Sequence, residues 1–380
     1  MDDNDSALLN DSGEQTKERA IAKAEEVVNG LNNVVLNIAV TGETGAGKSS
    51  FVNAIRGVKV GEKGSAPIGV TECTTEVTMY PHPTMPNVRI WDLPGIGTPR
   101  FKAKTYLKDV KFKNYDFFII VSAFRFKEND LTLAKEIKKQ KKNFYFVRSK
   151  IDLDVRNEME NGRAEEEVLH HIREDCLRNL SELGPPPIFL ITSKDLSKFD
   201  FQKLQETMES DLPSQKKDVI VLSLPVYSMQ SLEKKYSTLK KAIWALAVVS
   251  GGIAVAPVPG LSFAIDTTMV GSFFTNCYFS FGLDDKTLRK LSDRVDKPIL
   301  EEVKKSKLMQ AIVNSSPLTT NMAAKLGAAG IAEALSSLVP IAGSAVAAGV
   351  SFLSTRSVLL EGLDELYRVA KKVIEMAGLQ

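Results

Sequence analysis

The chain has 380 residues, of which 43% are apolar and 25% charged, and its formal net charge is +2. This length predicts two domains, or one domain with a large addition, in a soluble globular protein. The balanced charge argues against a nucleic acid partner. The three cysteines lie far apart and lack metal-ligand spacing, which favours reduced thiols in a cytosolic protein.

Residues 1–33 are expected to form an N-terminal helical segment with a disordered start. The stretch "TKERAIAKAEEVVNGLNN" carries apolar residues at helical spacing and predicts one amphipathic helix. The acidic start "MDDNDSALLN" is unlike a secretory signal, and Asp2 excludes N-myristoylation. The end "EMAGLQ" has no cysteine for prenylation.

Residues 34–213 are predicted to form an α/β domain. Five short apolar runs are typical of buried strands: "VVLNIAV", "NVRIWD", "FFIIVSAF", "NFYFVRS" and "PIFLITS". Stretches with helical periodicity, such as "TLAKEIKKQKK" and "EEEVLHHIREDCLRNLSEL", separate most of them. Alternation of buried strands and helices indicates a doubly wound, mostly parallel sheet.

After Pro213 the strand signals largely stop, and residues 214–380 are predicted to form a helical domain. The helical stretches include "SLEKKYSTLKKAIWALAVV", "DKTLRKLSDRV", "PILEEVKKSKLMQAIV" and "EGLDELYRVAKKVIEMA". We find no repeat of fixed period.

The segment "TGETGAGKSS" matches the phosphate-binding pattern G-x-x-x-x-G-K-S, and it lies between a predicted strand and a predicted helix. The glycines let successive backbone N–H groups face phosphate oxygens, and the helix N-terminus adds positive potential. Lys48 is expected to reach the β- and γ-phosphates and Ser49 to ligate Mg²⁺. The predicted phosphate-binding residues are Gly42, Glu43, Thr44, Gly45, Ala46, Gly47, Lys48, Ser49 and Ser50.

The stretch "IWDLPG" places an Asp and a Gly three apart at the end of a buried strand. We expect Asp92 to hold Mg²⁺, through water, and the Gly95 N–H to sense the γ-phosphate.

Residues that follow two later predicted strands are expected to select guanine over adenine. "SKID" fits the N/T-K-x-D pattern, in which the Asp152 carboxylate accepts from N1–H and the 2-amino group of guanine. Adenine offers neither donor and would leave that carboxylate unpaired. The Lys150 stem is expected to pack on the base and ribose. In "ITSK", residues Thr192, Ser193 and Lys194, the Ser193 N–H is expected to face the guanine O6.

The segment "APIGVTECTTE" is the plausible switch I, where a threonine should complete the Mg²⁺ shell. Thr71 and Thr74 compete for this role, and Thr71 is favoured. Glu72 is a candidate to orient water or to contact a partner, with an ordinary solvated glutamate as the alternative. Ile96 occupies the position where Ras-like enzymes carry a glutamine that orients the attacking water, so slow basal hydrolysis is expected.

The segments "GETGAGKSSFVNAIRG", "MPNVRIWDLPGIGTPRF", "YDFFIIVSAFRF", "KNFYFVRSKID" and "PPIFLITSKD" closely resemble the immunity-related, interferon-inducible GTPases of vertebrates. The likeness extends over about residues 15–295, through "SDLPSQKKDVIVLSLP", "SLEKKYSTLKKAIW" and "FGLDDKTLRKL". The "GKS" of the loop is similar to that of the effector-like members. Ile68 departs from the threonine that many members carry before the "G-V" of switch I.

The resemblance implies a Ras-like G domain beside a helical domain built from the N- and C-terminal segments. It implies slow, cooperative GTP hydrolysis with GDP as product, and Mg²⁺ as cofactor. It further implies dimers or oligomers formed through G domains, related GTPases as further partners, and peripheral action on intracellular membranes around pathogens. Glu72 corresponds to the switch I glutamate of the family. Lys48, Thr71, Glu72 and Gly95 are the predicted catalytic residues, and Ser49, Thr71 and Asp92 the predicted metal ligands.

Two uncharged apolar segments, 242–265 and 334–355, are long enough to span a membrane. Both contain proline and are rich in small residues, which favours buried helices over a membrane-inserting hairpin. The basic runs 135–143 and 301–308 are expected to be solvated, with contact to anionic headgroups as the alternative. Three functions therefore remain open: a GTPase that assembles on membranes, a GTP-gated switch that recruits effectors, and a membrane-inserting protein.

Overall fold

The computed structural model describes residues 33–69, 74, 76–96, 106–123, 128–184, 187–252, 267–295 and 352–379, together with 299, 303, 306, 308–310 and 312. The chain divides into two compact units, Val34–Leu224 and Met1–Asn33 with Pro225–Gln380. The boundary lies after Leu224, not after Pro213 as the change in strand signals suggested. The reason is helix α9 (Ser214–Ser223), which packs against the sheet of the first unit.

A six-stranded sheet forms the centre of the first unit, in the order β2-β3-β1-β4-β5-β6. The strand β2 pairs with β3 antiparallel at one edge, and all other neighbours pair parallel, which confirms the predicted mostly parallel α/β sheet. The strands are β1 (Leu36–Thr41), β2 (Thr78–Pro81), β3 (Val88–Asp92), β4 (Phe117–Ala123), β5 (Asn143–Ser149) and β6 (Ile188–Leu190).

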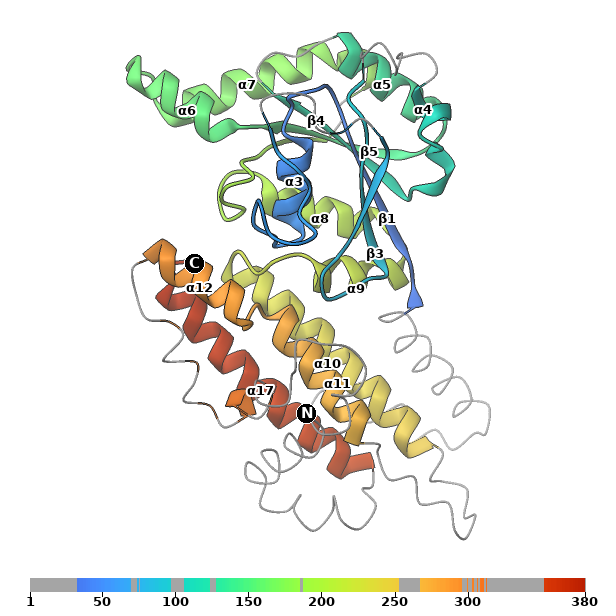
Figure 1. Ribbon diagram of the computed structural model, residues 1–380, viewed down its shortest axis with the longest axis vertical. Coiled ribbons are helices and arrows are strands. Elements are labelled where there is room, and N and C mark those ends of the chain that lie inside the picture. Colours follow the sequence, from blue (N-terminus) through green and yellow to red (C-terminus); the bar gives the residue numbers. More distant parts are fainter. Residues whose placement is uncertain are drawn as a thin grey trace. The chain divides into compact units, whose positions relative to one another are not determined.

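Helices cover both faces of this sheet (Figure 1). One apolar core joins Phe118 and Phe146 of the sheet to Leu133 of α5 and Val168 of α7. On the opposite face Tyr145 donates to Asp211 of α8 over 3.0 Å. The helices are α3 (Lys48–Ile55), α4 (Tyr106–Asp109), α5 (Glu128–Lys139), α6 (Ile151–Glu160), α7 (Glu165–Asn179) and α8 (Phe201–Asp211), with α9.

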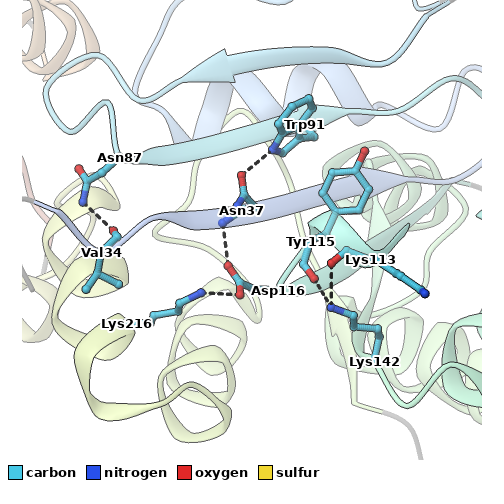
Figure 2. Close-up of polar contacts among 9 residues, drawn as sticks. All are labelled: Val34, Asn37, Asn87, Trp91, Lys113, Tyr115, Asp116, Lys142 and Lys216. Atoms are coloured by element: carbon cyan, nitrogen blue, oxygen red, sulfur yellow. Dashed lines mark hydrogen bonds and ion pairs between the residues drawn. The ribbon is translucent and has the colours of Figure 1, made fainter. Parts of the chain in front are cut away.

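Polar side chains link the start of β1 to the residue before β4, to α9 and to Trp91 of β3 (Figure 2). The Asp116 carboxylate accepts from the backbone N–H of Asn37 over 2.8 Å and pairs with Lys216 of α9. The Asn37 side chain in turn accepts from the Trp91 indole over 3.0 Å. In parallel sheets the binding loops follow the carboxyl ends of the strands. The bonds of Asp116 stabilise the opposite end of the sheet and leave these loops free.

In the second unit the described residues form the helices α10 (Met229–Gly252), α11 (Thr267–Ser280), α12 (Asp285–Val295) and α17 (Phe352–Met376). The long helices α10 and α17 pack together, and Tyr236 donates to Asp364 over 2.7 Å. The predicted helical character after Leu224 is thus confirmed for these stretches. The amphipathic helix predicted before Asn33 lies outside the described residues.

Within the described stretches, none of the helices combines the length and the apolar character that a membrane crossing requires. Most of the two apolar segments, 253–265 and 334–351, lies outside these stretches, so their insertion stays untested. The parts that are described are 242–252, which end helix α10, and 352–355, which begin helix α17.

Candidate functional site

The phosphate loop connects β1 to α3 at the carboxyl end of the central strand. Gly42, Gly45 and Gly47 have φ of 134°, 80° and 92°, which side chains rarely allow. A Cβ on Gly42 would lie 2.0 Å from the Val121 carbonyl oxygen of β4. The glycines therefore let the loop turn closely over the sheet, as the phosphate-binding pattern requires.

Lys48 is the first residue of α3 and only 6% exposed. Its ammonium donates to the Glu43 carbonyl over 2.9 Å, so the side chain folds back across the loop it follows. A buried ammonium at a helix N-terminus attracts an anion. The contact of Lys48 with the β- and γ-phosphates stays a prediction.

Ser49, Asp92 and Thr74 meet beside the loop. The Ser49 hydroxyl donates to Asp92 Oδ2 over 2.6 Å, and the Thr74 hydroxyl donates to the same oxygen over 3.1 Å. The two hydroxyl oxygens are 3.3 Å apart. Thr74 is thus the switch I threonine that the structure places at this cluster, whereas the favoured Thr71, and Glu72, lie outside the described residues.

The cluster fits a magnesium ion. Asp92 is fully buried, and its Oδ1 makes no hydrogen bond within the part of the chain that the structure describes. Burial raises the pKa of Asp92 above its ordinary value, and the Ser49 hydroxyl and the Lys48 charge oppose this rise. A buried carboxylate oxygen beside two hydroxyls is the hard oxygen set that Mg²⁺ prefers.

The residues that are predicted to bind guanine follow the carboxyl ends of β5 and β6. The two oxygens of Asp152 accept from the Thr192 hydroxyl over 2.9 Å and from the Lys194 ammonium over 2.8 Å. Burial raises the pKa of Asp152, but these hydrogen bonds outweigh it and the pKa is lowered. Asp152 is therefore a charged acceptor with free lone pairs, as recognition of guanine N1–H and the 2-amino group requires. Ser193 lies between the two donors in sequence, half-buried.

The "SKID" segment also contacts the phosphate loop directly. Lys150 donates to the Gly45 carbonyl over 2.9 Å, and Ser149 donates to the Ala46 carbonyl over 2.6 Å. Lys150 itself has a left-handed backbone with φ of 59°. The sequence pattern did not predict the role of Ser149, although it is the first residue of the matched motif.

Gly95 and Ile96 lie against the other side of the loop. A Cβ on Gly95 would come within 2.2 Å of the Thr44 hydroxyl oxygen. Ile96 donates from its N–H to the Gly42 carbonyl over 3.2 Å, and its side chain is 2% exposed in the core. The Ile96 side chain is therefore part of the apolar core of this unit.

Asn129 is a loop contact that the sequence motifs missed. From the start of α5 its amide donates to Glu43 Oε1 over 2.9 Å, across 86 positions of sequence. No local pattern signals such a contact, because it depends on the sheet bringing β4 beside β1.

The family model described as "Interferon-inducible GTPase (IIGP)" matches residues 12–355. T-cell-specific guanine nucleotide triphosphate-binding protein 2 of Mus musculus is 45% identical over 285 residues, which cover 73% of this chain and 68% of that protein. Interferon-inducible GTPase 5 of Rattus norvegicus is 39% identical over 362 residues, covering 93% and 78%.

Among solved structures, a variant of Aquifex aeolicus Era bound to GDP.AlF4- is 20% identical with a TM-score of 0.33, over 57% of this chain and 70% of that one. The assignment of the fold rests on the strand order and the phosphate loop, and the assignment of the family on the matched length and identity. The chain belongs to the interferon-inducible GTPase family, and it is a GTP-binding protein that hydrolyses GTP.

Proposed function

We propose that this GTPase works as an assembly switch: GTP-bound copies associate through their G domains, and association speeds up hydrolysis. The observation that carries the proposal is the burial of Ile96, which is 2% exposed. At this position a Ras-like enzyme has a glutamine that orients the attacking water. An apolar side chain in the core cannot do so, and a second copy is a source of the missing group.

Mg²⁺ is the proposed cofactor. Ser49, Asp92 and Thr74 would hold it directly or through water, at the cluster whose hydroxyls and carboxylate lie 2.6–3.3 Å apart. When bound, the ion neutralises charge on the β- and γ-phosphates. The protein's own part is positioning: the loop glycines and Lys48 hold the phosphates, and Asp152 fixes the base.

The assembly proposal is tested by the specific rate of GTP hydrolysis, measured over a wide range of protein concentration. We expect turnover per molecule to rise with concentration, and light scattering to grow with GTP but not with GDP. A flat specific rate together with unchanged scattering would refute assembly and favour an effector-recruiting switch.

We further propose that the assembly acts peripherally on intracellular membranes in cell-autonomous immunity. The family membership and the names of the relatives support the immune role. Carbonate washing of cell membranes tests the peripheral attachment, because a peripheral protein is released. Retention after the wash would favour insertion through the apolar segments.

A further inference from the structure

Helix α3 carries a row of polar residues on one face. Ser49, Asn53 and Arg56 follow one another at spacings of four and three, which places them on the same side of a helix. Asn53 is only 2% exposed and Arg56, the C-cap, 6%. Buried polar side chains need partners, and all three find theirs in the connection between α3 and β3.

Asn53 holds the start of this connection. Its Nδ2 donates to the Ala66 carbonyl over 2.8 Å, and its Oδ1 accepts from the Ala66 N–H over 2.7 Å. Ala66 is fully buried. The side-chain amide thus satisfies both backbone groups of one residue, as a neighbouring strand would.

Arg56 bonds to two points of the connection, one on each side of switch I. Its Nη1 donates to the Gly64 carbonyl over 3.0 Å, and its Nε and Nη2 donate to the Pro81 carbonyl over 3.2 and 3.0 Å. The guanidinium also lies 5.2 Å from the centre of the Tyr80 ring. Gly64 precedes switch I and Pro81 ends β2, so one side chain spans the segment.

Thr74 lies between these anchors in sequence, and its hydroxyl contacts that of Ser49 in α3. The first turn of α3 contains Lys48 and Ser49. Asn53 and Arg56, near the end of the helix, bond to the chain on both sides of switch I. Pinning Ala66 and Pro81 leaves only residues 67–80 between the two fixed points, which lowers the entropy lost when Thr74 is placed. The position of Thr74 therefore depends on α3, the helix that begins with the phosphate-binding residue Lys48.

We propose that Asn53 and Arg56 are positioning residues for GTP hydrolysis: they place Thr74 at the Ser49–Asp92 cluster by fixing the chain on both sides of switch I to α3. The inference rests on the proposed magnesium site. GDP lacks the γ-phosphate, so its binding depends less on switch I. Loss of an anchor should therefore impair turnover with GTP and leave GDP affinity nearly unchanged.

The first test compares Asn53→Ala with the wild-type chain. We expect kcat to fall roughly 10- to 100-fold, the Mg²⁺ concentration for half-maximal rate to rise, and GDP affinity to stay within about 2-fold. Asn87→Ala is the matched control, because the Asn87 amide makes a similar bond of 2.9 Å to the Val34 carbonyl at the far end of the sheet (Figure 2). It should change stability without changing the Mg²⁺ dependence. Equal effects of the two variants on kcat and on Mg²⁺ dependence would overturn the proposal.

The second test is a double-mutant cycle with Thr74→Ala, and it separates positioning from general damage. If Asn53 acts through Thr74, Asn53→Ala should have little further effect on kcat in the Thr74→Ala background. Full additivity would overturn the proposal. Arg56→Lys serves if Asn53→Ala folds poorly, because lysine keeps the charge but cannot bond Gly64 and Pro81 together; its effect should also vanish in the Thr74→Ala background.

The Mg²⁺ dependence of the wild-type chain distinguishes failure of the proposed magnesium site from failure of the positioning role of Asn53 and Arg56. Turnover that does not depend on Mg²⁺ would refute the proposed metal site, and with it this inference. Mg²⁺-dependent turnover that Asn53→Ala and Arg56→Lys leave unchanged would refute the inference alone.

Discussion

Lys150 donates a hydrogen bond of 2.9 Å to the carbonyl of Gly45, 105 positions earlier in the chain. The residue that is expected to pack on the base thus contacts the loop that is expected to hold the phosphates. The bond arises because β1 and β5 both pair with β4, so that their carboxyl ends lie at the same edge of the sheet. Base and phosphate contacts should accordingly depend on each other, and changes in one should be felt in the other.

Asp152→Asn should shift the base preference from guanine towards xanthine. The amide can donate to the xanthine carbonyl, but it no longer accepts both guanine donors that the carboxylate between Thr192 and Lys194 can bind. The loss of discrimination should be about 100-fold or more. Competition between GTP and XTP for the purified protein measures it. Unchanged GTP preference would remove Asp152 from the base site.

Lys48→Ala should abolish tight binding of nucleotide. Removal of the buried ammonium should cost about 3 kcal/mol or more, which is about a 100-fold loss of affinity. Titration calorimetry with GTP and GDP measures the loss. The exposed Lys63 provides the control, because Lys63→Ala removes the same charge from the surface. Retained affinity in Lys48→Ala would contradict the assigned loop.

Gly42→Ala should destabilise the first unit even without nucleotide. The new Cβ would lie 2.0 Å from the Val121 carbonyl oxygen, so β1 and β4 would have to separate locally. We expect a loss of about 3 kcal/mol or more. Gly61→Ala is the control, because Gly61 has φ of 84° but no atom within 4 Å of the new Cβ, and it should cost about 1 kcal/mol. Denaturant unfolding gives both values; similar losses would argue against the clash.

The burial of Lys235 should make the free energy of unfolding depend on pH. This side chain of α10 is 1% exposed, and burial lowers its pKa to about 7. The unfolded chain keeps an ordinary lysine of higher pKa, so between the two values the unfolded state binds the extra proton. Stability should therefore rise as the pH rises above about 7.

Lys235→Met should raise the unfolding midpoint at pH 7 and flatten this rise. Lys240→Met, at an exposed position of the same helix, should do neither. Urea unfolding of the full chain at several pH values measures both effects. The same pH slope in Lys235→Met and in the wild type would show that the burial of Lys235 does not control it.

Local pattern predicted the elements whose residues are buried on both sides. The strand β4 is nearly all apolar and buried, and its range was predicted to within one residue. The strand β2 was missed because its four residues alternate between half-buried and exposed and end in Pro81. An edge strand needs a partner on only one side, so its sequence carries little apolar signal.

The nucleotide motifs were predicted because each is a short run of residues in fixed order. The contacts between motifs could not be predicted in this way. Asn129 reaches Glu43, and Asn53 reaches Ala66, only once the chain has folded. The same holds for Thr74: its hydroxyl lies beside Ser49 and Asp92 only once the chain has folded, and no local pattern signals this contact.

The indole of Trp91 supplies the protein with an optical probe at a useful place. It precedes Asp92 in β3, donates to Asn37, and lies edge-on to Tyr115 with ring centres 5.6 Å apart. The sequence has one other tryptophan, Trp244 in α10. A chain with Trp244→Phe therefore has a single tryptophan, and it is joined by one peptide bond to the proposed magnesium ligand. Its emission can follow, without any added label, the exchange of one nucleotide for another.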